Sequence, residues 1–170
     1  MLLMPLPWKF ATACFLRRDK ITLLIDYTNY KHPIHEGFFS PPGGKIEEGE
    51  EPTQTTRREM REETGIIVRN LVYRGIIYFD NEKRTIKGRP FKYNFRVHIY
   101  DCYDFDDSNA FAKEGKFFWV EDEQVPSLRL HEGDKELWRW LSIYKEVEGT
   151  IVEEGERFSR GTILKAIPFS

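Results

Sequence analysis

The feature that most constrains this chain is a densely charged segment of fixed spacing, residues 44–66, which reads GKIEEGEEPTQTTRREMREETGI. Pro52 suits the first position of a helix, where a missing N–H costs nothing, and Gly65 suits the left-handed residue that ends a helix. We therefore predict a helix over Pro52–Thr64.

Three carboxylates share one face of this predicted helix, because they are spaced i, i+3 and i+4: Glu59, Glu62 and Glu63. Like charges on adjacent turns repel one another, and a hard divalent cation resolves that repulsion, since carboxylate oxygens are ligands that Mg²⁺ prefers. Mg²⁺ also keeps substrate phosphates as ligands, so this face predicts phosphate chemistry. The alternative is a solvated surface helix in which Arg58 pairs with Glu62, because charge runs are usually solvated.

Two glycines precede the helix, Gly43 and Gly44, directly after a pair of prolines. Glycine allows the backbone to approach a ligand closely, so we expect Gly43 to lie against substrate. Glu50 stands ahead of the helix, where it can reach Arg58 and hold the start of the helix against the loop.

Length and charge bound the class of protein. The chain has 170 residues and a formal net charge of -2, so we expect a single domain over residues 1–170 and no stable complex with nucleic acid. Cys14 and Cys102 lack metal-type spacing and are interpreted as buried thiols in a reducing cytoplasm. Residues 1–7 are too short and proline-broken for a signal peptide or a membrane span, so we expect a cytoplasmic protein that does not enter membranes.

Apolar runs and turn signals predict the other elements. We predict a second helix over residues 133–147, a loop over residues 30–42 and a C-terminal hairpin over residues 150–168. Five strands are predicted, over residues 10–16, 21–25, 71–79, 95–103 and 117–120. Strands mixed with two helices predict an α/β or α+β sandwich.

The charged segment resembles the Nudix box: a glycine, five residues, Glu, seven residues, Arg-Glu, an aliphatic, any residue, Glu-Glu, any residue, glycine and an aliphatic. Its fixed positions are filled by Gly44, Glu50, Arg58, Glu59, Met60, Glu62, Glu63, Gly65 and Ile66. The resemblance implies an α/β/α sandwich with a mixed sheet. It also implies Mg²⁺, with Mn²⁺ as the other cation, and a substrate in which a nucleoside diphosphate is linked to another group.

The resemblance also implies roles for the box residues. Glu59 and Glu63 would be metal ligands, with Glu62 close by and the backbone carbonyl of Gly44, or of the glycine before it, as a further ligand. Arg58 would orient Glu59. Glu62 and Glu59 are both candidates for the general base that takes a proton from the attacking water.

Looser motifs outside the box resemble the MutT-type 8-oxo-dGTP diphosphatases: His35-Glu36-Gly37, Glu114-Gly115, Gln124-Val125-Pro126 and Glu132-Gly133-Asp134. This resemblance implies that Glu114 joins the metal site, whereas the alternative is an exposed loop acid. It implies that Asp134 reads the base, whereas the alternative is an acid that favours the first turn of a helix.

The chain departs from that pattern in two places. The strand before the loop lacks the arginine that often contacts phosphate, so the phosphate clamp would come from Lys31, Lys45 or Arg17. His131 replaces an aromatic residue that commonly stacks near the base. The aromatics that could stack a base, or could belong to the core, are Phe38, Phe39, Tyr78 and Phe79.

The favoured function is a nucleoside triphosphate pyrophosphohydrolase of the 8-oxo-dGTP diphosphatase type, which releases the monophosphate and pyrophosphate. The alternatives within the enzyme class are hydrolysis of ADP-ribose, a nucleotide sugar, a dinucleoside polyphosphate or capped RNA. A Nudix-fold binding module without catalysis is a third interpretation, although the box glutamates are all present. Both a monomer and a homodimer are compatible with the sequence.

Overall fold

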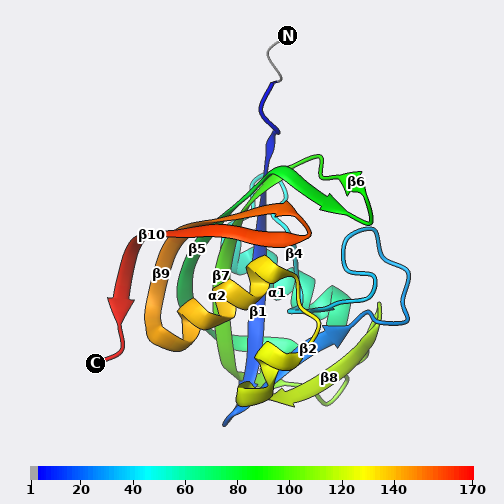
Figure 1. The fold of residues 1–170 in the computed structure, drawn as a ribbon. Coiled ribbons are helices and arrows are strands. Elements are labelled where there is room, and N and C mark those ends of the chain that lie inside the picture. The colour runs from blue at the N-terminus through cyan, green and yellow to red at the C-terminus, as the bar shows by residue number, and fades with distance from the viewer. Residues whose placement is uncertain (1–3) are drawn as a thin grey trace.

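A mixed 10-stranded β-sheet forms the middle of the molecule (Figure 1). The computed structural model describes residues 4–170, so part of the predicted apolar N-terminus, residues 1–3, lies outside the described chain. The main path of the sheet is β10-β9-β5-β7-β1-β2-β3, in which β1 pairs with β7 and β5 pairs with β9 in parallel. The strands are β1 (Trp8–Arg18), β2 (Ile21–Asp26), β3 (Phe39–Ser40), β4 (Gly43–Lys45), β5 (Ile67–Ile86), β6 (Arg89–Pro90), β7 (Asn94–Asp106), β8 (Lys116–Glu121), β9 (Tyr144–Gly155) and β10 (Arg157–Pro168).

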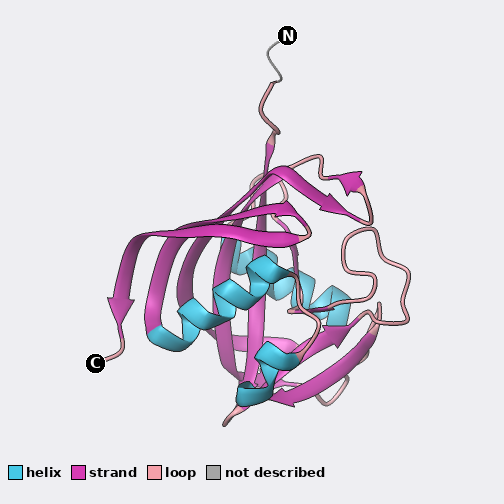
Figure 2. Ribbon diagram, viewed as in Figure 1, coloured by secondary structure: helices cyan, strands magenta, loops and turns pink. Residues whose placement is uncertain are grey.

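Two helices cover opposite faces of this sheet, α1 (Pro52–Thr64) and α2 (Glu132–Ile143) (Figure 2). Successive residues of a strand point to opposite faces, and β1 shows this directly. Phe15 packs in the cluster that contains the apolar side chains of α2, whereas Cys14 and Leu16 pack with Met60 of α1. The predicted α/β/α arrangement with a mixed sheet is therefore confirmed, and Cys14 and Cys102 are buried free thiols as predicted.

Helix α1 has the predicted bounds, and its two ends explain them. Glu51 and Gln54 form a reciprocal capping box at the start, next to Pro52. Gly65 adopts φ 66° at the end and donates its N–H to the carbonyl of Arg61. Within residues 4–170, no helix has the length and apolar character needed to cross a membrane.

The predicted strands lie inside longer observed ones. The largest difference is β5, which runs for 20 residues although only residues 71–79 were predicted. Its second half is polar, and it is held as a strand by long-range pairing with β9 and by the short strand β6. The predicted loop over residues 30–42 holds one short strand, β3.

The predicted end of the second helix is wrong, because α2 stops at Ile143 and not at residue 147. Arg74, on the neighbouring β5, donates to the carbonyls of Leu141 at 2.6 Å and Tyr144 at 3.0 Å, so it caps the last turn. From Tyr144 the chain continues as β9, whose Val147 is buried against β5.

Strands β9 and β10 pair as an antiparallel hairpin that contains the predicted residues 150–168 and begins earlier, at Tyr144. β10 forms one edge of the sheet, and the turn of the hairpin lies above the start of α2 in Figure 1. A 3-10 helix, η1 (Asp122–Ser127), leads from β8 toward α2.

Candidate active site

One cavity of about 360 Å³ lies between α1, the sheet and α2, with walls from β1, β2, β4, β5 and β7. It brings together residues that are distant in sequence. The predicted site residues that line it are Gly43, Gly44, Lys45, Glu59, Glu63, Glu114 and Asp134. Residues 43–63 reach it from β4 and α1, and Asp134 reaches it from the first turn of α2.

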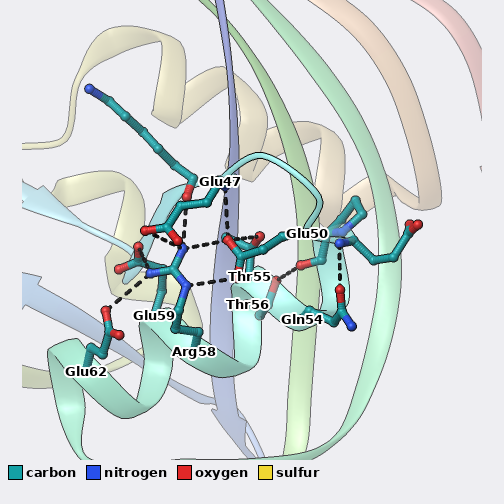
Figure 3. Close-up of polar contacts among 11 residues, drawn as sticks. Glu47, Glu50, Gln54, Thr55, Thr56, Arg58, Glu59 and Glu62 are labelled. Carbon is teal, nitrogen blue, oxygen red and sulfur yellow. Dashed lines mark hydrogen bonds and ion pairs between the residues drawn. The ribbon is translucent and has the colours of Figure 1, made fainter.

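Arg58 organises the carboxylates of α1 (Figure 3). Its Nε and Nη2 donate to the two carboxylate oxygens of Glu50 at 2.9 and 2.8 Å, and Nη2 also donates to the carbonyl of Lys45 at 3.2 Å. Its Nη1 donates to Glu59 at 2.8 Å and to Glu62 at 3.2 Å. The hydrogen bonds from Arg58 are the main cause that lowers the pKa of Glu50 to about 2. The predicted contact between Glu50 and Arg58 is therefore present, and it fixes α1 to the loop before it.

The glycines of β4 permit two close contacts. A Cβ on Gly44 would lie 2.2 Å from the carboxyl carbon of Glu59, and a Cβ on Gly43 would lie 2.0 Å from the carbonyl oxygen of Thr12. Neither position can hold a larger residue without displacing its neighbour. Gly44 thus lets the backbone of β4 lie directly against the Glu59 carboxylate.

Glu63 and Glu114 add negative charge to the same cavity. Burial raises the pKa of Glu63; Lys113, whose Nζ is 3.8 Å away, opposes this, and the charges of Glu114 and Glu59 reinforce it. Glu114 has His32 as a neighbour, with 3.4 Å between Nε2 and the carboxylate. The carboxylates therefore influence one another across the cavity without full compensation.

This donor set fits a hard divalent cation in its chemistry, because it consists of carboxylate oxygens. In the described residues 4–170, no three Asp, Glu, His or Cys side chains already surround one point as metal ligands do. Glu59 is held by Arg58, and Glu62 does not line the cavity, since its side chain is 51% exposed and directed to Arg58. Small rotations of Glu59, Glu63 and Glu114 would be needed to share one ion.

A second group of charged residues, Asp134 and Arg84, lines the same cavity. Burial raises the pKa of Asp134 to about 7, with a further contribution from Glu153 and an opposing one from Arg84. Arg84 is only 9% exposed and pairs with Glu153. The interior of the cavity therefore carries a carboxyl group that changes charge near neutral pH, beside a guanidinium.

Three histidines connect the two charged groups. His32 and His35 stack at 4.7 Å between ring centroids, and His35 Nδ1 lies 3.2 Å from His131 Nε2. Burial lowers the pKa of His35 to about 3 and also lowers the pKa of His131. His35 and His131 are therefore neutral at physiological pH and provide polar, uncharged walls. His131, which was noted as a departure from the family pattern, stacks on Phe38 at 4.0 Å.

Of the three residues predicted to bind phosphate, Lys45 lines the cavity and the other two do not. Lys45 lines the cavity, with its Nζ 5.9 Å from the centre of the Tyr93 ring. Lys31 is exposed and is not part of the cavity wall. Arg17 is also absent from this wall and pairs with Asp122 at 2.5 Å.

The aromatic candidates for base stacking do not all lie in the cavity wall. Phe79 lines the cavity, whereas Phe39 packs against Phe118 and Tyr78 packs edge-on against Trp8. Further cavity residues that the sequence did not single out for this site are Tyr27, His32, His35, Arg84, Phe91 and Phe95. Arg84 and Phe91 carry no local signal, because a long strand and a short turn bring them to the cavity.

Comparisons with known proteins identify the family of this chain. The NUDIX domain profile matches residues 7–141 of the chain. An uncharacterized Nudix hydrolase from Bacillus subtilis (strain 168), YvcI, is 29% identical over 124 residues, which are 72% of this chain and 72% of that protein.

Solved structures share the fold. A mutator MutT protein from Bacillus halodurans superposes with a TM-score of 0.73 at 22% identity, over 92% of this chain and 97% of that one. A MutT protein from Methanosarcina mazei Go1 gives a TM-score of 0.64 at 18% identity, over 82% and 96% of the two chains. The ORF135 protein of E. coli gives 0.61 at 24% identity, over 79% and 88%.

Proposed function

This chain belongs to the Nudix family and is a pyrophosphohydrolase, and on that premise we propose that it cleaves a nucleoside triphosphate into the monophosphate and pyrophosphate. The first candidate substrate is 8-oxo-dGTP, and the proposed cation is Mg²⁺, with Mn²⁺ as the alternative. One observation carries the proposal: a single cavity joins Glu59 and Glu63 to Asp134. A phosphate chain at the carboxylates would leave its base at Asp134. The MutT names of the structural neighbours support this order of candidates.

The residues proposed to hold the cation are Glu59, Glu63 and Glu114, with Glu62 and the carbonyl of Gly44 nearby. When bound, Mg²⁺ supplies neutralisation of the phosphate oxygens and acidification of a water. Arg58 positions the Glu59 carboxylate, and Gly44 gives that carboxylate room against β4.

A carboxylate of α1 is proposed to take the proton from the attacking water. The water oxygen forms a bond to a phosphorus on one side of the α–β bridge, the bridging P–O bond breaks, and the group on the other side leaves with the bond electrons, so that the products are the monophosphate and pyrophosphate. Glu62 and Glu59 are the two candidates for this base. Glu62 is 51% exposed and Glu59 is 14% exposed, and Nη1 of Arg58 donates to both carboxylates. Comparing pH–rate profiles of Glu62→Gln and Glu59→Gln identifies the base, since only its loss removes the acidic limb.

The other cavity residues are proposed to hold the substrate. Lys45 and the backbone of Gly43 contact the phosphates, and Asp134 contacts the base. Phe79, which also lines the cavity, offers a face on which a base can stack.

A release assay tests the proposal. Hydrolysis with Mg²⁺ is compared across 8-oxo-dGTP, dGTP, ADP-ribose, a UDP-sugar and diadenosine tetraphosphate. Preference for 8-oxo-dGTP, with monophosphate and pyrophosphate as products, supports the proposed function. Preference for a sugar or a dinucleoside polyphosphate keeps the glutamate mechanism and rejects the triphosphate assignment. Binding of these ligands without Mg²⁺ and without turnover would instead indicate a binding module.

We also propose a cytoplasmic location and a monomeric or homodimeric state. Cys14 and Cys102 are both free thiols, which suits a reducing compartment. Sedimentation of the purified chain distinguishes the two states.

A further inference from the structure

Two residues of the cavity wall, Arg84 and Asp134, are supported by a segment that the NUDIX domain match does not reach. The match ends at residue 141, and β9 begins at Tyr144. In the pairing of β5 with β9, Arg84 lies opposite Gly155, so the turn of the β9–β10 hairpin lies beside the far end of β5 (Figure 1). Residues near this turn can therefore contact both β5 and the start of α2.

Glu153 makes both contacts. Its side chain is 3% exposed, and its carboxylate accepts a hydrogen bond from the backbone N–H of Gly133 and pairs with Nε of Arg84. A Cβ on Gly133 would lie 2.8 Å from this carboxylate, so the glycine makes the close contact possible. Glu153 thus fixes the guanidinium of Arg84 and the residue directly before Asp134.

Arg84 is held rigidly and still has a donor to offer. Its Nη1 donates to Asn81 at 3.2 Å, and its guanidinium lies 4.2 Å from the centre of the Phe91 ring. Asn81 is 1% exposed and donates to the carbonyl of Tyr93 at 3.0 Å, so the support is itself fixed. Within residues 4–170, Nη2 of Arg84 donates no hydrogen bond.

Asp134 is the matching acceptor. It is partly exposed and lines the same cavity as Arg84, and its carboxyl makes no hydrogen bond in the part of the chain that the structure describes. Nη2 of Arg84 and the carboxyl of Asp134 therefore offer one cavity a donor and an acceptor that a single ligand can satisfy together.

We propose that Arg84 is a specificity-determining residue that donates to a ring carbonyl of the bound base, and that Glu153 is the residue that positions it. The inference rests on the proposed function for the presence of a nucleotide, and it names the class of base. An ionised Asp134 accepts from a ring N–H beside that carbonyl. Guanine, hypoxanthine and uracil carry a carbonyl next to an N–H. Adenine instead carries an amine that would face the Arg84 donor and a ring nitrogen without a hydrogen that would face the Asp134 carboxylate. Both contacts would be repulsive.

Equilibrium binding of IMP and AMP tests this without any catalytic step, because the two ligands differ only on this edge of the base. Calorimetry is performed at pH 8, where Asp134 is ionised. Wild type is expected to bind IMP about 10-fold more tightly than AMP, which corresponds to about 1.4 kcal/mol and lies within the range of one such recognition pair. Arg84→Met is expected to reduce this ratio to within about 3-fold.

Lys83→Met is the matched control, because it removes the same charge from the adjacent residue of β5, which is exposed. This variant should keep the wild-type ratio. Glu153→Gln keeps an acceptor for the N–H of Gly133 but loses the charge that holds Arg84, so IMP binding should weaken while AMP binding stays unchanged. A purely structural effect would weaken both ligands equally.

Thermal unfolding establishes that each variant is folded. Should Arg84→Met fail this check, Asp134→Asn retains the shape of the carboxyl group and is expected to lower the same ratio. The inference is overturned by a wild-type ratio near one, or by a folded Arg84→Met with the wild-type ratio. A chain that hydrolyses a UDP-sugar rather than triphosphates, yet binds IMP over AMP through Arg84, would lose the proposed function and retain this inference.

Discussion

Among single residues, Glu63 carries the clearest prediction for activity. It lines the cavity, and the negative charges of Glu114 and Glu59 both raise its pKa. Glu63→Gln keeps the size of the side chain but removes one negative ligand, so kcat with Mg²⁺ should fall by at least about 100-fold. Glu48→Gln is the control, since Glu48 is exposed and forms no ion pair within residues 4–170. Wild-type kcat in Glu63→Gln would reject the metal assignment.

Because Asp134 ionises at different pH in the folded and unfolded states, we expect the free energy of unfolding to depend on pH. Its pKa is raised from 3.8 to about 7, chiefly by burial, so the folded state keeps a proton that the unfolded chain releases. The free energy of unfolding should therefore decrease as pH rises from about 4 to 7 and then level off. Asp134→Asn lacks this ionisation and should have a higher Tm than wild type, by a margin that is larger at pH 8 than at pH 5. Equal margins at the two pH values would contradict the assignment of this shift to Asp134.

The residues that sequence reasoning could place in the cavity share a local signal. Gly44, Glu59 and Glu63 follow from spacing within one segment, which fixes their relation through a single turn and helix. Arg84 and Glu153 have no such signal, because they meet only after β5 and β9 pair across about 70 residues of chain. Their pairing depends on register, which the sequence of either strand does not specify alone.

At the scale of elements, the junction after α1 couples the helix to the loop that carries Glu114. Gly65 has φ 66°, and a Cβ there would lie 2.5 Å from the carbonyl oxygen of Asn109. Gly65→Ala should therefore lower stability by more than the roughly 1–2 kcal/mol that a left-handed backbone costs other residues. Gly49→Ala isolates that backbone term, because Gly49 has φ 82° with open space around it. Urea unfolding of both variants measures the difference, and equal losses would mean that the contact with Asn109 is unimportant.

The two helices show how far an element can be read from its own residues. Both ends of α1 are set by neighbours in sequence, the Glu51 and Gln54 capping box and Gly65, and its bounds were predicted correctly. The end of α2 is set by Arg74, which lies about 70 residues earlier, and its predicted end was wrong. Local caps are visible in a sequence, whereas a cap supplied by a remote strand is not.

For the whole molecule, Arg74 joins helix α2 to two strands of the sheet, β9 and β7. From β5 its Nε donates to the carbonyl of Lys145 at 2.7 Å, its Nη2 donates to Leu141 and Tyr144 at the end of α2, and its Nη1 pairs with Asp101 of β7. Asp101 is 1% exposed, and burial raises its pKa although Arg74 opposes this. The helix, the hairpin and the centre of the sheet therefore depend on one buried guanidinium.

Arg74→Met should accordingly destabilise the whole chain, because it leaves the buried Asp101 with a more distant partner, Arg17 at 3.8 Å, and removes the donors at the end of α2. Loss of one member of a buried ion pair costs about 3–5 kcal/mol, and urea unfolding measures it as a lower midpoint. Arg69→Met on the same strand is the control: its pair with Asp104 is about half exposed at 3.1 Å, so its loss should cost under about 1 kcal/mol. Adding Asp101→Asn to Arg74→Met removes the buried charge that has lost its nearest partner and should recover part of the loss. Similar losses for the two arginine variants would show that Arg74 does not connect the helix to these strands in this way.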